Sequence, residues 1–171
     1  MDRETLKALQ APLKQQYQSD PQTAVATLHA VGIVDFQLPG CRAALPCNDG
    51  RDAIAGLHSK AGGDGTAACS GDMLLQSLVT CAGTTLAVVA TAMGLSVTTA
   101  RIEANAEMDF RGTLGIDRSV PVGLTSIELL FNIETSASDE QVEKLIQLTE
   151  RYCVVLQTLI KGVAVTSRRC A

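Results

Sequence analysis

The chain has 171 residues and a formal net charge of −4 at pH 7. Hydrophobic residues make up 46% of it and charged residues 19%, a balance that excludes intrinsic disorder and suits one domain with a buried core. The acidic charge, the absence of tryptophan and the presence of only two tyrosines and three phenylalanines argue against a nucleic-acid partner, which would need clustered basic residues or stacking aromatic rings.

The first residues and the cysteines indicate a compartment. Four of the six residues after Met1 are charged and no apolar segment follows them directly, so we expect no secretory signal. A chain of this size needs no disulfide framework to fold, and free thiols with one or two reactive members are the better interpretation of its six cysteines. These cysteines lie at positions 41, 47, 69, 81, 153 and 170. We therefore expect a cytoplasmic protein.

The N-terminal third begins with a helical pattern and continues with alternation. Residues 2–18 carry leucines at helical spacing and predict a short amphipathic helix, which Pro12 is able to kink or split. Residues 22–38 alternate between apolar and polar side chains. This pattern predicts a hairpin or a pair of strands, with Gly32 near the turn.

Residues 39–71 are rich in turn formers, including the sequence Asn-Asp-Gly at 48–50. A short strand or helical turn is expected at 52–58. The glycine-rich run at 62–66 invites comparison with a phosphate-binding loop, but no Gly-Lys-Ser/Thr follows it and the third glycine of a dinucleotide fingerprint is missing. We interpret the run as a turn.

A long apolar helix follows. Ser70 is placed to cap its first amides, Asp72 suits the positive end of the helix dipole, and Gly94 predicts its end after Met93. Residues 73–100 contain no charge, a length that could span a bilayer. The polar side chains within this segment, and ends that lack the Lys/Arg asymmetry and aromatic belt of a spanning helix, favour a central helix buried on most sides, so no membrane association is expected.

Two long strands are predicted after this helix. Residues 97–110 and 124–134 both alternate, and the segment between them, 111–123, is rich in glycine and proline and predicts a loop. Together with the preceding helix, the two strands form a meander-like order rather than the strict alternation of a doubly wound sheet.

The C-terminal third predicts two helices and a strand. Residues 138–141 form a capping box that opens the first helix, and a second, short helix is expected from near Tyr152 to Gly162. Residues 163–169 predict a closing strand. The whole order indicates an α+β fold.

Several common chemistries are missing from the sequence. The chain has no Cys-x-x-Cys or His-x-x-x-His spacing, and His29 and His58 are isolated, so we expect no metal site and no cofactor. A serine hydrolase needs a positioned histidine and usually a Gly-x-Ser-x-Gly turn, which the chain lacks. Cysteine remains as the candidate reactive group.

Two cysteines are candidates, and their local sequence leaves two interpretations open. Cys81 lies in the middle of the apolar helix, where a small buried core residue is the plain interpretation and a reactive thiol is the functional one. Cys153 lies early in the second short helix, beside Arg151, where helix packing would also explain it. Spacing alone does not decide between these interpretations.

Three stretches together resemble the OsmC/Ohr family, whose better-studied members reduce organic hydroperoxides with thiols. Residues 63–82 (GDGTAACSGDMLLQSLVTCA) resemble the family's glycine-bearing approach and the start of its central helix, which carries the first cysteine. Residues 90–97 (ATAMGLSV) resemble the end of that helix and the start of the next strand. Residues 149–159 (TERYCVVLQTL) resemble the segment of the second cysteine. The likeness covers about residues 22–169.

The resemblance implies an OsmC-like fold with a long buried central helix, meander strands and an intertwined homodimer. It implies an N-terminal helical extension at 1–20 and an OsmC-like domain at 21–171. Cys81 would be the peroxidatic thiol and Cys153 the resolving thiol of a peroxidase acting on organic hydroperoxides, with an external dithiol restoring both.

The sequence departs from the family pattern at two activating groups. Peroxidase members hold an arginine from an N-terminal loop against the thiol, whereas residues 27–33 here contain none. Asp72 stands where the family usually has a Pro-Glu pattern, and Cys69 is an additional thiol at the helix start. A second hypothesis is therefore a non-catalytic dimer that binds a small apolar or acidic metabolite. The candidates for the missing cation are Arg42, Arg51, Arg111 and Arg118.

Overall fold

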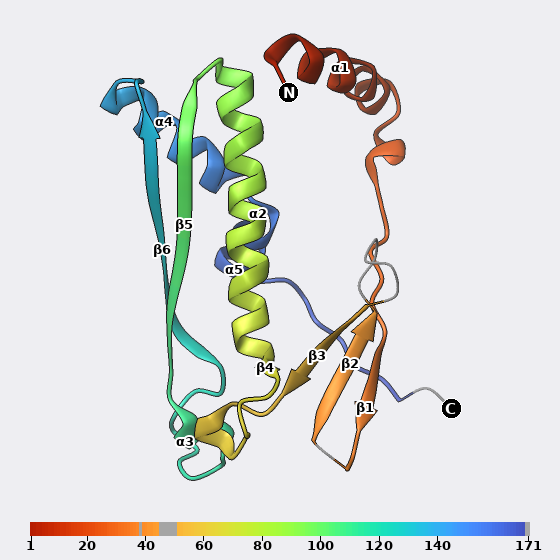
Figure 1. Cartoon of the computed structure of the whole chain (residues 1–171). Helices are drawn as coiled ribbons and strands as arrows, with labels where there is room; N and C mark the ends of the chain where they lie inside the picture. The colour runs from red at the N-terminus through yellow and green to blue at the C-terminus, as the bar shows by residue number, and fades with distance from the viewer. Residues whose placement is uncertain (38, 45–50, 170–171) are drawn as a thin grey trace. The chain divides into compact units, whose positions relative to one another are not determined.

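The computed structural model describes residues 1–37, 39–44 and 51–169 (Figure 1). Contacts between residues divide the chain into two compact units. The helical unit comprises Met1–Gln10, Ser77–Ala104 and Leu129–Ala171, and the sheet unit comprises Ala11–Gln76 and Asn105–Glu128. The turn predicted at 48–50, and the thiols of Cys47 and Cys170, lie outside the described residues.

The predicted apolar helix is α2, Ser70–Met93, and it forms the core of the helical unit. The chain leaves the helix at Gly94, whose φ of 70° is a left-handed conformation that favours glycine, as predicted. The buried cluster joins α2 to α4 (Asp139–Tyr152). Its members are Leu86, Val89, Ala90 and Leu145, with Ile102, Phe131, Ile133 and Leu148 packed against them.

A two-stranded sheet covers α2 in the helical unit (Figure 1). Its strands are β5, Val97–Met108, and β6, Leu124–Thr135, which confirm the two predicted long strands. Near one end of the pair the Thr135 hydroxyl donates to the Ser96 carbonyl at 2.6 Å, and near the other the Thr125 hydroxyl donates to the Glu107 carbonyl at 3.2 Å. This pairing makes the two strands antiparallel.

The capping box is confirmed at the start of α4. The Gln141 amide donates to the Ser138 hydroxyl at 3.4 Å, and the Ser138 amide donates to the Gln141 side-chain carbonyl at 3.0 Å. After a break at Cys153, α5 runs over Val154–Lys161 and its C-cap is Gly162, close to the predicted bounds.

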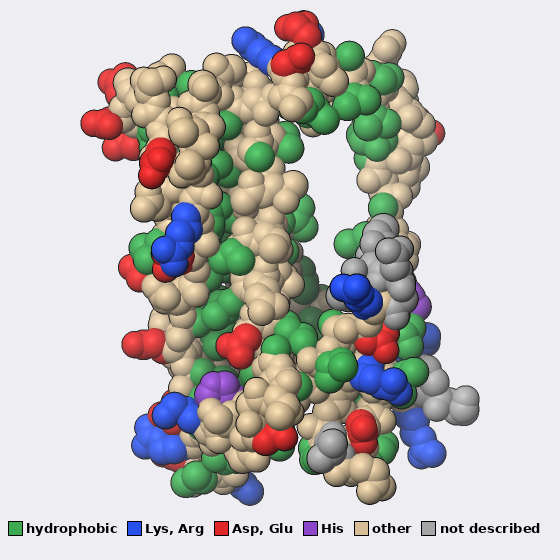
Figure 2. Space-filling view, viewed as in Figure 1, with side chains coloured by type: hydrophobic (Ala, Val, Ile, Leu, Met, Phe, Trp, Pro, Cys, Tyr) green, Lys and Arg blue, Asp and Glu red, His purple; other side chains and the backbone are tan. Residues whose placement is uncertain are grey.

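One face of α2 is buried and the other is open in the single chain. The buried residues are Leu78, Ala82, Leu86, Val89 and Ala90. On the opposite side Val88 is 39% exposed, and Figure 2 shows uncharged side chains along the upper part of this helix. Within the described residues α2 is the one helix whose length and composition would allow it to cross a membrane. The prediction of a helix buried on most sides therefore holds for one face only.

The sheet unit contains a four-stranded sheet with the strand order β1-β2-β3-β4. The first three are antiparallel, and β4 runs parallel to β3. Cys41 of β2 pairs with Val34 on one side and with Ala55 on the other. The strands are β1 (Gly32–Asp35), β2 (Gly40–Ala44), β3 (Asp52–Gly56) and β4 (Ala68–Cys69).

The predictions for residues 22–44 were partly wrong. Gly32 begins strand β1 instead of lying at a turn, and its partner is β2, within a segment predicted to be turns. The alternating residues before Gly32 form no strand: Pro21–Ala24 is a 3₁₀ turn, and Leu28 is 91% exposed. Alternation alone does not make a strand, because a strand also requires a partner for its backbone groups.

Three further details differ from the predictions. The Gly71 amide donates to the Cys69 sulfur at 3.4 Å, so Cys69 takes the capping position predicted for Ser70. One helical turn, α3 (Phe110–Thr113), begins the segment predicted as loop, and the Asp109 carboxylate caps it. Residues 163–169 form no strand and are exposed, since no strand of this chain pairs with them within the described ranges.

The predicted N-terminal helix is α1, Arg3–Ser19, which continues through Pro12 without dividing. Leu6 is its buried residue, while Leu9 and Leu13 are exposed. The division into an extension at 1–20 and a domain at 21–171 stays a prediction.

Candidate functional site

The two candidate cysteines lie in the helical unit, one within α2 and the other between α4 and α5. Cys153 has φ −70° and ψ 107°, an extended conformation that ends α4 and starts α5. Its amide donates to the Thr149 carbonyl at 2.8 Å, and its carbonyl accepts the Gln157 amide at 2.9 Å. The backbone groups of Cys153 are therefore fixed by both helices, which holds its side chain at the break.

The structure brings the two thiols together. Burial opposes ionisation of Cys81, but hydrogen bonding from the Val155 amide, the Cys153 thiol and the Val154 amide outweighs it and holds the pKa of Cys81 below its ordinary value. Burial raises the pKa of Cys153, and its interaction with the Cys81 sulfur raises it further. One thiol is thereby favoured as a thiolate and its neighbour as a proton-bearing thiol.

The two cysteines also differ in solvent exposure. Cys153 is completely buried, whereas Cys81 is half-buried. A small molecule can therefore reach Cys81 more easily than Cys153. A thiolate within reach of solvent, with a protonated thiol beside it, can attack an electrophile and then form a disulfide with its neighbour.

Within the helical unit, the groups that favour the Cys81 thiolate include two backbone amides. Val154 and Val155 are the first two residues of α5, and their amides have no acceptor within the helix. The positive end of a helix dipole stabilises a thiolate as a cation does. Arg111 instead pairs with Asp109, its Nε lying 3.0 Å from the carboxylate. The other candidate arginines, Arg42, Arg51 and Arg118, belong to the sheet unit, as Arg111 does.

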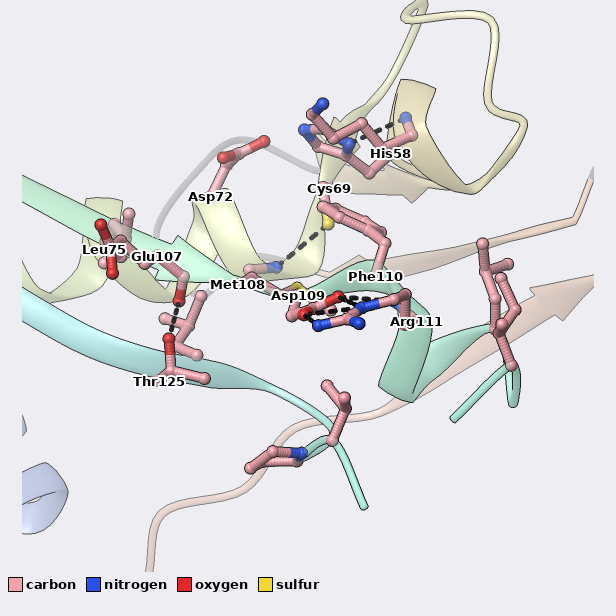
Figure 3. Close-up of a pocket in the computed structure, with 18 of the residues that line it drawn as sticks. His58, Cys69, Asp72, Leu75, Glu107, Met108, Asp109, Phe110, Arg111 and Thr125 are labelled. Carbon is pink, nitrogen blue, oxygen red and sulfur yellow. Dashed lines mark hydrogen bonds and ion pairs between the residues drawn. The ribbon is translucent and has the colours of Figure 1, made fainter. Parts of the chain in front are cut away.

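A separate cavity of about 1060 Å³ lies in the sheet unit, beside the first turn of α2 and beside α3 (Figure 3). Cys69 and Asp72 line it from the start of the helix, so these two predicted candidates belong to the sheet unit. Its apolar lining comes from α2, from α3 and from the residues on either side of α3. This lining is made by Leu75, Met108, Phe110, Leu114, Ile116 and Val120.

His58 lines the same cavity in a fixed orientation (Figure 3). Its Nδ1 accepts the Lys60 amide at 3.0 Å, at the start of the 3₁₀ turn Ser59–Ala61, and its ring stacks on Phe110 with 4.7 Å between centroids. The acceptor role of Nδ1 places the proton of the neutral ring on Nε2. His29 is exposed, and within the described ranges no three His, Cys, Asp or Glu side chains gather as metal ligands.

The glycine-rich run is a turn, as predicted. The Asp64 carboxylate accepts the Thr66 amide at 2.9 Å and the Thr66 hydroxyl at 2.7 Å. Gly62 and Gly65 adopt positive φ values of 89° and 77° on either side. The carboxylate at its centre would repel a phosphate.

Comparison with known proteins decides the family. A family model described as OsmC-like protein matches residues 63–168, more than half of the chain, and the match includes α2, both long strands and both thiols of the pair. The chain belongs to the OsmC-like protein family. The α+β OsmC-like fold expected from the sequence is confirmed.

Solved structures share this OsmC-like fold at low sequence identity. An OsmC-like protein from Mycoplasma pneumoniae has a TM-score of 0.64 and 17% identity, covering 81% of this chain and 89% of that chain. An organic hydroperoxide resistance protein OsmC from Legionella pneumophila has a TM-score of 0.60 and 16% identity, covering 81% and 91%. An organic hydroperoxide resistance protein from Elizabethkingia anophelis has a TM-score of 0.61 and 13% identity, also covering 81% and 91%. Comparison with curated proteins gave no match.

Sequence reasoning selected the two thiols but missed the groups around them. The amides of Val154 and Val155 are backbone groups, and no side-chain pattern shows where they point. The prediction that Cys153 lies early in a helix was the available signal, since the first amides of any helix are unpaired.

Proposed function

We propose that this OsmC-like protein is a thiol-dependent peroxidase that reduces organic hydroperoxides, with Cys81 as the peroxidatic and Cys153 as the resolving cysteine. The observation that carries the proposal is the adjacency of the two thiols with opposite pKa shifts. The family match and the structural neighbours described as organic hydroperoxide resistance proteins give it support.

In the first step the Cys81 thiolate attacks the terminal oxygen of the hydroperoxide. The O–O bond breaks, an S–O bond forms, and the departing alkoxide takes a proton to leave as an alcohol. The sulfur is oxidised to a sulfenic acid and the peroxide is reduced. The α5 amides lower the pKa of Cys81 and so favour the thiolate, which is the nucleophile.

In the second step the Cys153 thiol attacks the sulfenic sulfur of Cys81. An S–S bond forms, and the hydroxyl leaves with the Cys153 proton as water. An external dithiol then reduces the disulfide and is itself oxidised to a disulfide. The raised pKa of Cys153 suits this order, since Cys153 keeps its proton until Cys81 has reacted.

The test is a thiol titration of the reduced protein before and after one equivalent of cumene hydroperoxide, followed by peptide mapping. We expect the loss of two thiols per chain and a Cys81–Cys153 disulfide. Unchanged thiols would overturn the proposal and leave a binding role. A disulfide that contains Cys69 would assign the chemistry to another thiol.

We also propose a homodimer. Apolar side chains remain exposed on the open face of α2 and on β1, where Val88 is 39% and Ile33 is 62% exposed. Residues 163–169 lack a strand partner within their own described chain. A second copy could cover these surfaces. Sedimentation equilibrium is expected to give about twice the 18.0 kDa mass of the chain, and a monomer at micromolar concentration would contradict the dimer.

We propose that the protein is cytoplasmic. A cytoplasmic location suits the described cysteines, which are all free.

The second candidate function is binding of a small metabolite in the cavity of the sheet unit, which is favoured by its apolar lining. Its carboxylates, from Asp72, Glu107 and Asp109, outnumber Lys60 and Arg111 and therefore favour an apolar ligand over an acidic one.

A further inference from the structure

The break between α4 and α5 leaves backbone groups that need partners. The last carbonyls of α4 have no amide one turn ahead within that helix, and the first amides of α5 have no carbonyl behind them. The Cys153 amide satisfies the Thr149 carbonyl. The next carbonyl, that of Glu150, accepts the side-chain Nε2 of Gln157 at 2.9 Å.

We propose that Gln157 is a positioning residue: its carboxamide ties α5 to the end of α4 and so keeps the first turn of α5 facing the Cys81 sulfur. The bond joins residues seven positions apart and crosses the break at Cys153. The inference rests on the proposed peroxidase function, since it assigns the element that activates the attacking thiol.

The geometry explains why a tie is required here. Cys153 is the one extended residue between the two helices, so rotation about its backbone would swing α5 relative to α4. The amides of Val154 and Val155 lie directly after this joint and would move with it. A side-chain bond from Gln157, one turn into α5, restrains that rotation from the far side of the joint.

Thr158 provides a matched control on the same helix. Its hydroxyl donates to the Val154 carbonyl at 2.8 Å, which is also a side-chain to backbone bond. Both of its partners lie within α5, so this bond does not cross the break. Removing it tests whether any loss of a hydrogen bond in α5 affects Cys81.

The experiment compares Gln157→Met, Gln157→Asn and Thr158→Val with the wild type. Methionine keeps the length of the side chain without a donor, and asparagine keeps the amide but is too short to cross the break. The alkylation rate of Cys81 by iodoacetamide is measured by peptide mass spectrometry from pH 5 to 10, since alkylation reports the thiolate. Circular dichroism confirms that each variant is folded.

Because the native pKa of Cys81 lies below its ordinary value, loss of the amide contacts should raise it. The midpoint of the alkylation profile should move to higher pH in both Gln157 variants, with a rate about threefold lower below the midpoint, and should stay unchanged in Thr158→Val. An unchanged profile in both Gln157 variants, or an equal shift in Thr158→Val, would overturn the inference. Hydroperoxide turnover is measured in a separate assay. Alkylation of Cys81 does not require peroxidase activity, so the role of Gln157 can fail or hold independently of the peroxidase proposal.

Discussion

Replacing Cys81 with serine is expected to reduce hydroperoxide turnover to the uncatalysed background, a loss of about a thousandfold or more. A serine hydroxyl is a far weaker nucleophile than a thiol whose pKa is lowered, and the surrounding amides cannot make up for the lost sulfur. The measurement is consumption of cumene hydroperoxide with dithiothreitol as the reductant.

Two further variants separate the steps of the reaction. Cys153→Ser should still consume one equivalent of peroxide and leave a sulfenic acid on Cys81 that dimedone traps, because Cys153 acts after the first step. Cys41→Ser should keep full turnover, since Cys41, in β2, is not one of the two thiols of the proposed pair. Turnover that survives in Cys81→Ser would refute the assigned mechanism.

The elements predicted correctly are those whose signals lie within a short stretch of sequence. Both partners of the capping box at Ser138 lie within four consecutive residues, and Gly94 ends α2 because glycine readily adopts the left-handed conformation. The strands predicted wrongly depend on distant partners. β2 lies in a segment rich in turn residues and is a strand because it pairs with β1 and β3. Residues 163–169 have a strand-like pattern but no partner strand within the described residues.

The candidate site shows the same division. Cys81 and Cys153 could be named because their surroundings resemble a family, and the structure then places the two thiols together. The amides that lower the pKa of Cys81 could not be named, because they are backbone groups at a helix start and not side chains. The family pattern predicts an arginine side chain beside the thiol, whereas any positive electrostatic potential at the sulfur stabilises a thiolate.

Leu145→Ala is expected to have the largest effect on stability, a loss of about 3 to 5 kcal/mol in the free energy of unfolding. Leu145 is completely buried and belongs to the cluster that joins α4 to α2, so the shorter side chain would leave a cavity between them. Urea denaturation at a fixed protein concentration measures the change, since a dimer would make stability depend on concentration. Leu130→Ala, at a position 42% exposed on β6, is the matched control and should lose less than about 1 kcal/mol.

The same substitution should also weaken the thiol pair, because α4 connects Leu145 to it. The Thr149 hydroxyl donates to the Leu145 carbonyl at 2.8 Å, and the Thr149 carbonyl accepts the Cys153 amide at 2.8 Å. A cavity at position 145 would weaken the packing that holds these two hydrogen bonds, and with them the backbone of Cys153, in place. Disulfide formation after a dose of peroxide should therefore slow in conditions where the variant is still folded. A variant that loses stability but oxidises at the wild-type rate would show that the break at Cys153 is held by α5 and its Gln157 bond rather than by the packing of α4.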